Sequence, residues 1–120
     1  MRYLDLNSLT PSQLFGTWKT LERFTGQSAD SFFHSTSTLD LNQDGTFVSR
    51  NGNTATGRWE MFRENEIIYN PQLNFFDDTP EPLNAIITRF REDQEGEGTT
   101  QKMTLYFSSG LEIVFGRTVT

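Results

Sequence analysis

The sequence predicts an all-β fold: an eight-stranded antiparallel up-and-down β-barrel with a short N-terminal helix, in one domain spanning residues 1–120. Three observations predict it. Turn residues recur at short intervals, apolar and polar residues alternate between the turns, and aromatic residues are frequent, with eleven Phe and two Trp. A flat meander of eight strands would expose two long edges, and closure into a barrel removes both.

The helix is predicted close to the start of the chain. Thr10 is a suitable N-cap, Pro11 takes the first helical position, and Gln13 completes the pattern of a capping box. Two apolar residues then lead into Gly16, which predicts a helix of about one turn.

Eight strands are predicted from runs of β-favouring residues between turn signals. The clearest turn is Asn51-Gly52, a dipeptide typical of a tight hairpin. Two longer connections, 25–35 and 70–82, each carry a pair of phenylalanines, and 92–98 is predicted to be a solvated acidic loop. The predicted strands are 16–24, 36–41, 46–50, 54–62, 66–69, 83–91, 99–107 and 111–119.

Charge and composition exclude several classes of function. The formal net charge of −6 disfavours nucleic-acid binding, which needs clustered Lys and Arg. The absence of Cys excludes disulfides, thiolate catalysis and Cys-ligated metal. No apolar run has the length of a membrane span and no signal peptide is visible, so we expect no membrane insertion and, by default, a cytoplasmic protein; a trimmed leader would leave the same sequence. The oligomeric state is not indicated.

Three short motifs follow one another in a definite order. A short helix leads into Gly16-Thr17-Trp18, a later strand ends in an Asp44-Gly45 turn, and a second Gly-x-Trp follows at Gly57-Arg58-Trp59. This order resembles the lipocalin and fatty-acid-binding (calycin) superfamily and is most similar to its bacterial lipocalin-like domains. The resemblance implies a barrel that holds a small hydrophobic molecule. Residues 25–35 are too few and too polar for the helix pair of the fatty-acid carriers.

Arg117 on the last predicted strand has two interpretations. Alternation with Ile113 and Phe115 points it into the barrel, and closure brings the last strand beside the first, which carries Trp18. The resemblance implies that its guanidinium stacks over this indole. The alternative is that Arg117 grips a ligand carboxylate. The tyrosine that ends the Arg-x-Tyr pair of fatty-acid carriers is missing after Arg117.

The leading functional hypothesis is non-catalytic binding of a small hydrophobic molecule inside the barrel, without a cofactor or metal. Apolar burial would supply the affinity. The paired phenylalanines of the two long connections either plug the open end or form a movable lid. The predicted ligand-binding residues are Trp18, Phe32, Phe33, Leu39, Leu41, Phe47, Trp59, Met61, Phe75, Phe76, Met103, Leu105, Phe115 and Arg117.

Two other hypotheses stay open. One is a cyclase or isomerase that uses the cavity, with Glu22, Tyr69 and His34 as weak catalytic candidates. Glu22 lies four residues after Trp18, so regular alternation could place both on the inner face, and a bulge would turn Glu22 outward. The other hypothesis is a filled barrel that acts as a structural or interaction module, and an interior packed by its own aromatic side chains would favour it.

Three further residues or motifs give weaker signals. His34 is the only histidine, so it is an ordinary loop residue, a group at a pocket mouth or a haem ligand, but not part of a zinc site. The motif from Asp40 to Gly45 matches half of an EF-hand loop, yet Asn51 stands where the bidentate acid belongs, so we interpret it as a hairpin turn. For Arg89 the alternation does not decide which face it takes.

Overall fold

The computed structural model describes residues 2–3, 6, 9–24, 36–50, 54–62, 71–76, 83–96, 98–107 and 110–119. Within these ranges most residues belong to strands, and the only helical element is a 3-10 turn, η2. The elements are β1 (Arg2–Tyr3), η2 (Pro11–Gln13), β2 (Gly16–Phe24), β3 (Thr38–Leu41), β4 (Thr46–Arg50), β5 (Thr54–Phe62), β6 (Gln72–Phe76), β7 (Leu83–Glu95), β8 (Gly98–Phe107) and β9 (Glu112–Val119).

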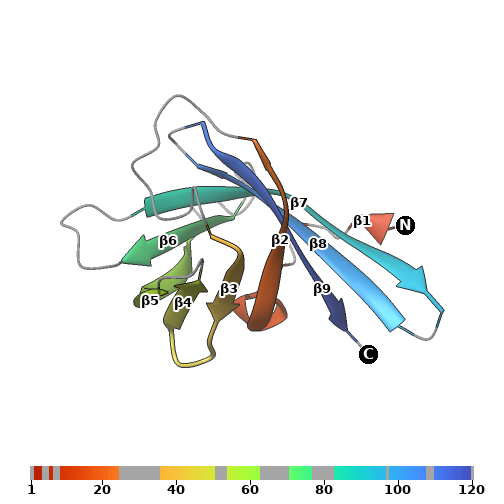
Figure 1. Ribbon diagram of the computed structural model, residues 1–120, viewed down its shortest axis with the longest axis horizontal. Coiled ribbons are helices and arrows are strands. Elements are labelled where there is room, and N and C mark those ends of the chain that lie inside the picture. Colours follow the sequence, from red (N-terminus) through yellow and green to blue (C-terminus); the bar gives the residue numbers. More distant parts are fainter. Residues whose placement is uncertain are drawn as a thin grey trace.

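The strands close into a barrel in the order of the chain. Each strand from β2 to β9 pairs antiparallel with the next, and β9 returns to pair with β2, from Lys19↔Gly116 to Phe24↔Glu112. The short β1 adds to the edge of β7 beyond the end of β6, at Tyr3↔Arg91 (Figure 1). The predicted eight-stranded up-and-down barrel is therefore confirmed, with η2 as its N-terminal helix.

Alternation along the strands builds the core. On β8, Met103, Leu105 and Phe107 are buried, and on β9 Ile113 and Phe115 are buried, as the sequence pattern predicted. The full set of buried apolar side chains is Leu9, Leu14, Trp18, Leu39, Leu41, Phe47, Trp59, Leu73, Phe75, Ala85, Ile87, Phe90, Met103, Leu105, Phe107, Leu111, Ile113 and Phe115.

The prediction for the middle of the chain was wrong in one element. Residues 72–76, assigned to a connection, form β6, with Leu73 and Phe75 in the core and Phe76 on the outer face. Flanking prolines suggested a loop, but Gln72 to Phe76 alternate regularly and pair on both sides, with β5 and β7. The predicted strand 66–69 lies outside the described residues.

The β7–β8 hairpin is longer than predicted. β7 continues to Glu95, and β8 begins at Gly98, so most of the expected acidic loop is paired strand. The turn itself contains Gly96, whose φ of +62° belongs to the left-handed region that glycine adopts without strain. This hairpin extends beyond the rest of the barrel (Figure 1).

Gly57 of the second Gly-x-Trp motif is required by packing. A Cβ placed on Gly57 would overlap the main-chain carbonyl oxygen of Phe76 and would lie 2.8 Å from Cε1 of Phe47. The absence of a side chain at Gly57 therefore lets the backbone of β6 approach β5 closely, and it leaves room for the Phe47 ring.

Replacing Gly57 by alanine is expected to lower the free energy of unfolding by about 1–3 kcal/mol, because the backbone of β6 and a buried ring must both shift. Equilibrium denaturation with urea measures this change. Thr56→Ala, at the exposed neighbouring position, is the matched control and should change stability by less than about 1 kcal/mol. Equal effects of the two substitutions would contradict the role given to Gly57.

Candidate functional site

The wall residues predicted to hold a ligand pack against one another. Seven of them, together with Phe75, have no solvent-accessible surface, and 6% of Trp59 is exposed. A side chain with no accessible surface borders no gap large enough for a water molecule. The seven are Trp18, Leu39, Leu41, Phe47, Met103, Leu105 and Phe115.

Aromatic side chains from different strands meet inside the barrel. The rings of Phe47 and Phe75 lie edge to face, 5.3 Å apart, and Phe75 stacks on Phe107 at 6.5 Å. The Trp18 ring meets Phe90 edge to face at 5.9 Å. These contacts have the geometry of a packed aromatic core. Of the other predicted ligand-binding residues, Met61 is half-buried, Phe76 is on the outer face, and Phe32 and Phe33 lie outside the described residues.

Arg117 binds the N-terminal turn to the barrel. Its guanidinium carbon lies 4.1 Å from the centre of the Trp18 ring, so the predicted stacking is confirmed. It donates hydrogen bonds to the carbonyl oxygens of Gln13 and Phe15, both at 2.5 Å, and to Oε1 of Gln101 at 2.9 Å. Desolvation by burial lowers the pKa of the Arg117 guanidinium below its usual value. These contacts give Arg117 a structural role at the η2 end.

Gly16 explains the first Gly-x-Trp motif. Its φ of +127° is a conformation that glycine adopts readily, and a Cβ there would lie 2.9 Å from Nη1 of Arg117. The indole nitrogen of Trp18 donates to the carbonyl oxygen of Leu14 at 2.9 Å. Glycine thus lets the chain turn from η2 into β2 directly beneath the guanidinium.

Two β-bulges decide which charged side chains face outward. In β2 the pairing with β9 skips Leu21, and in β7 the pairing with β8 skips Thr88. Each bulge puts an extra residue on its strand and reverses the alternation beyond it. Glu22 therefore points out of the barrel, which is the outcome expected if a bulge interrupts this strand. Arg89 also faces outward.

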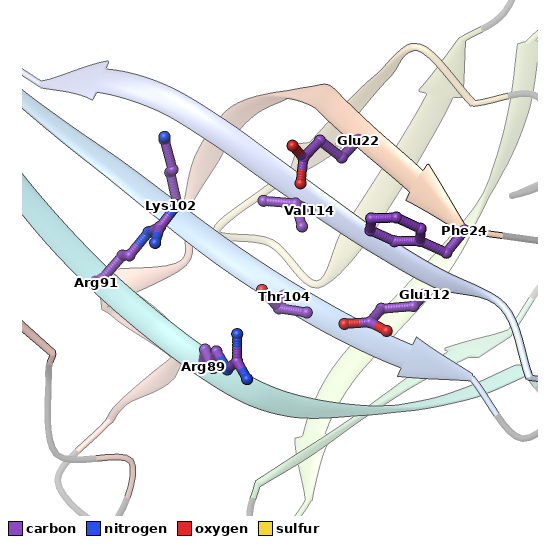
Figure 2. Close-up of a pocket in the computed structure, with 8 residues that line it drawn as sticks. All are labelled: Glu22, Phe24, Arg89, Arg91, Lys102, Thr104, Glu112 and Val114. Carbon is purple, nitrogen blue, oxygen red and sulfur yellow. The ribbon is translucent and has the colours of Figure 1, made fainter.

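The outward-facing residues of four neighbouring strands line a surface groove of about 390 Å³. The groove lies over β2, β9, β8 and β7, and Figure 2 shows its side chains projecting from one face of this sheet. Thr104 is buried at its floor. The lining residues are Glu22, Phe24, Arg89, Arg91, Lys102, Thr104, Glu112 and Val114.

Two cations of this groove lie next to each other on neighbouring strands. Arg91 lies directly opposite Lys102, and Arg89 lies opposite Thr104. Within the described part of the chain, the side chains of Arg89, Lys102, Glu22 and Glu112 form no ion pair or hydrogen bond. Like charges at opposed positions destabilise a sheet, whereas opposite charges would stabilise it. The side chains of Arg89, Lys102, Glu22 and Glu112 could therefore interact with a charged ligand.

Arg23 is an inward-facing residue that the sequence analysis missed, because the Leu21 bulge alone turns it inward. It lies opposite buried Ile113, at the end of the barrel away from η2. One guanidinium nitrogen donates to the carbonyl oxygen of Thr36, and Nε is buried without a hydrogen-bond partner among the described residues. The hydroxyls of Thr36 and Ser49 are 2.6 Å apart beside it.

The half-match to a calcium loop is a hairpin turn, as interpreted. Oδ1 of Asp44 accepts hydrogen bonds from the backbone N–H of Thr46 at 3.0 Å and from its hydroxyl at 2.6 Å. Both bonds lower the pKa of Asp44, the hydroxyl more strongly. Asp40 instead pairs with Arg50 and accepts a bond from the Thr17 hydroxyl at 2.7 Å. The two carboxylates are therefore already used within the hairpin.

Of the three weak catalytic candidates, the structure describes only Glu22. Glu22 lies on the outer face, and His34 and Tyr69 lie outside the described residues. Among the residues described, no group of three or more His, Asp or Glu side chains could hold a metal ion.

Comparison with known proteins adds no identification. No family model, curated protein or solved structure matches the chain. The closed eight-stranded barrel is consistent with a calycin-like fold. The described residues contain no helix of the length and apolarity needed to cross a membrane.

Proposed function

We propose that this chain is a non-catalytic binding module, with a filled barrel as scaffold and the outer groove of β2, β7, β8 and β9 as its contact surface. One observation carries the proposal: seven of the wall side chains that would hold an interior ligand have no accessible surface. Such packing leaves the barrel wall as a structural core. Of the alternatives that the sequence left open, this packing favours the filled barrel.

Three features of the groove support its assignment as the contact surface. Its volume of about 390 Å³ falls in the range of small-ligand sites. Glu22 and Arg89 are each turned into it by a bulge, and bulges commonly re-aim side chains at functional sites. Phe24, with 56% of its surface exposed, adds an apolar wall next to unpaired charges.

Methyl NMR tests the proposal, because two adjacent residues of β9 report on opposite faces. Val114 lines the groove and Ile113 lies in the core. With a library of small charged and apolar compounds, we expect binders to shift the Val114 methyl signals and to leave those of Ile113 and Leu105 unchanged. Arg89→Ala should weaken this response, and Arg58→Ala, on the exposed face of β5, should not.

A fluorescent fatty-acid analogue completes the test and is expected not to bind in a one-to-one ratio. Stoichiometric uptake with shifts at Ile113 and Leu105, or no Val114 shift with any compound, would contradict the proposal.

The second candidate function is binding of a small hydrophobic molecule with an anionic group at the barrel end that carries Arg23. The buried Nε of Arg23 favours it, because this donor has no partner in the part of the chain that the structure describes and an unsatisfied buried donor costs about 1–3 kcal/mol. A carboxylate there would accept from Arg23 near the hydroxyls of Thr36 and Ser49. Ile113 lies opposite Arg23, so the same spectra separate the two candidates.

A further inference from the structure

The charges of the groove are separated by sign. The cations Arg89, Arg91 and Lys102 come from β7 and β8, and the carboxylates Glu22 and Glu112 come from β2 and β9. Figure 2 shows the two sets on opposite sides of Thr104 and Val114. Strands in a sheet lie about 4.8 Å apart, so β7 and β2, three strands apart, place Arg89 and Glu22 roughly 14 Å from each other at the backbone.

The separation extends along the strands as well. Lys102 is opposite Gly116 and Glu112 is opposite Tyr106, four residues further along β8. Four residues of antiparallel strand span about 14 Å. The groove therefore has a positive corner and a negative corner, and the side chains reach from both toward its centre.

A ligand with one type of charge would satisfy only one corner. An anion held by the cations of β7 and β8 would leave both carboxylates unpaired, and a cation held by the carboxylates would leave Arg89 and Lys102 unpaired. A zwitterion satisfies both. Its apolar part would contact Phe24 and Val114, and the Thr104 hydroxyl at the floor would bond to a polar group in the middle.

We infer that the groove binds a short peptide with free termini, its carboxylate on Arg89, Arg91 and Lys102 and its ammonium group on Glu22 and Glu112. This inference rests on the proposed function and specifies its ligand class. An extended tripeptide spans about 10 Å. The long charged side chains of the two corners reach inward and bridge the rest of the distance between the corners. Because Phe24 lies beside Glu112, an apolar N-terminal side chain fits the negative corner.

The probe is the tripeptide phenylalanyl-glycyl-glycine, tested by calorimetry in three forms: with free termini, N-acetylated, and C-amidated. We expect the free form to bind and each blocked form to bind at least tenfold more weakly, because each block removes one ion pair in a partly desolvated groove. Raised salt should weaken the free form further.

Two charge-neutralising variants give a crossed pattern that a merely structural effect would not produce. Glu112→Gln should weaken the free and the C-amidated peptide and leave the N-acetylated one unchanged. Lys102→Gln should weaken the free and the N-acetylated peptide and spare the C-amidated one. Glu60→Gln and Arg58→Gln, on the exposed face of β5, are the matched controls and should change nothing. Thermal unfolding of every variant checks that it is folded.

The possible outcomes distinguish a wrong ligand class from a wrong binding surface. If the N-acetylated peptide binds as well as the free form while Val114 shifts, the ligand is a simple anion and the inference is wrong, although the groove remains the binding surface. If no peptide shifts Val114 but other compounds do, the inference is equally wrong. If peptide binding shifts Ile113 instead, the proposed function itself fails.

Discussion

Trp18→Ala is expected to lower the free energy of unfolding by about 3–5 kcal/mol, the usual cost of removing a large buried aromatic side chain. The side chain has no exposed surface and meets Phe90 edge to face. Its loss also removes the support beneath the Arg117 guanidinium and the hydrogen bond to the Leu14 carbonyl oxygen. The substitution would leave a cavity at position 18 directly beside the Arg117 guanidinium, which would have lost its aromatic partner.

Urea denaturation followed by the fluorescence of the remaining Trp59 measures this effect. Phe24→Ala is the control, because Phe24 is an aromatic residue of the same strand on the exposed face; we expect it to change stability by less than about 0.5 kcal/mol. Trp18→Phe keeps most of the apolar volume and should fall between the two. A loss below about 1 kcal/mol for Trp18→Ala would show that Trp18 is not central to the core.

Arg117→Met is expected to cost about 2–3 kcal/mol. Methionine keeps the apolar stem over Trp18 but leaves the carbonyl oxygens of Gln13 and Phe15 without their donor, and unsatisfied partly buried groups cost about 1–3 kcal/mol. Arg117→Lys should restore less than half of this loss, because an ammonium group cannot donate in a fork to both carbonyls. Guanidinium groups stay charged, so the cost should not vary between about pH 5 and 9.

Two measurements check the Arg117 prediction. Denaturation gives the total cost, and hydrogen exchange of the Leu14 amide, which donates to Pro11, shows whether η2 loosens. Arg50→Met is the control: the Arg50 side chain is 51% exposed and pairs with Asp40 at the surface, so its loss should cost less than about 1 kcal/mol. If the Leu14 amide exchanges at the same rate in Arg117→Met, then Arg117 does not hold the turn.

The closed barrel could be predicted because the alternation of apolar and polar residues, which identifies the inner face of a strand, is visible within each strand alone. Met103, Leu105 and Phe107 alternate with polar residues, and the same parity on β9 leads from Ile113 to Arg117. Once the last strand meets the first, Arg117 and Trp18 are neighbours. Turn chemistry at Asp44-Gly45 was equally local.

The groove was not predictable, because it depends on a single extra residue in each of two strands. Leu21 and Thr88 are ordinary strand residues, and nothing around them signals a bulge. Without the bulges, Glu22 and Arg89 would take the opposite faces. The groove also joins β2 to β7, two strands that only the closed topology places on either side of β8 and β9.

The pairing of β2 with β9 has a consequence for how the protein forms in the cell. The hydrogen bonds from Arg117 to Gln13 and Phe15 join positions more than 100 residues apart. Contacts of such long sequence separation form slowly, since the intervening chain must first be ordered. A ribosome-bound chain that has emerged only as far as β8 therefore has neither its last strand nor the arginine that fastens its first turn, and folding must wait until synthesis has passed Val119.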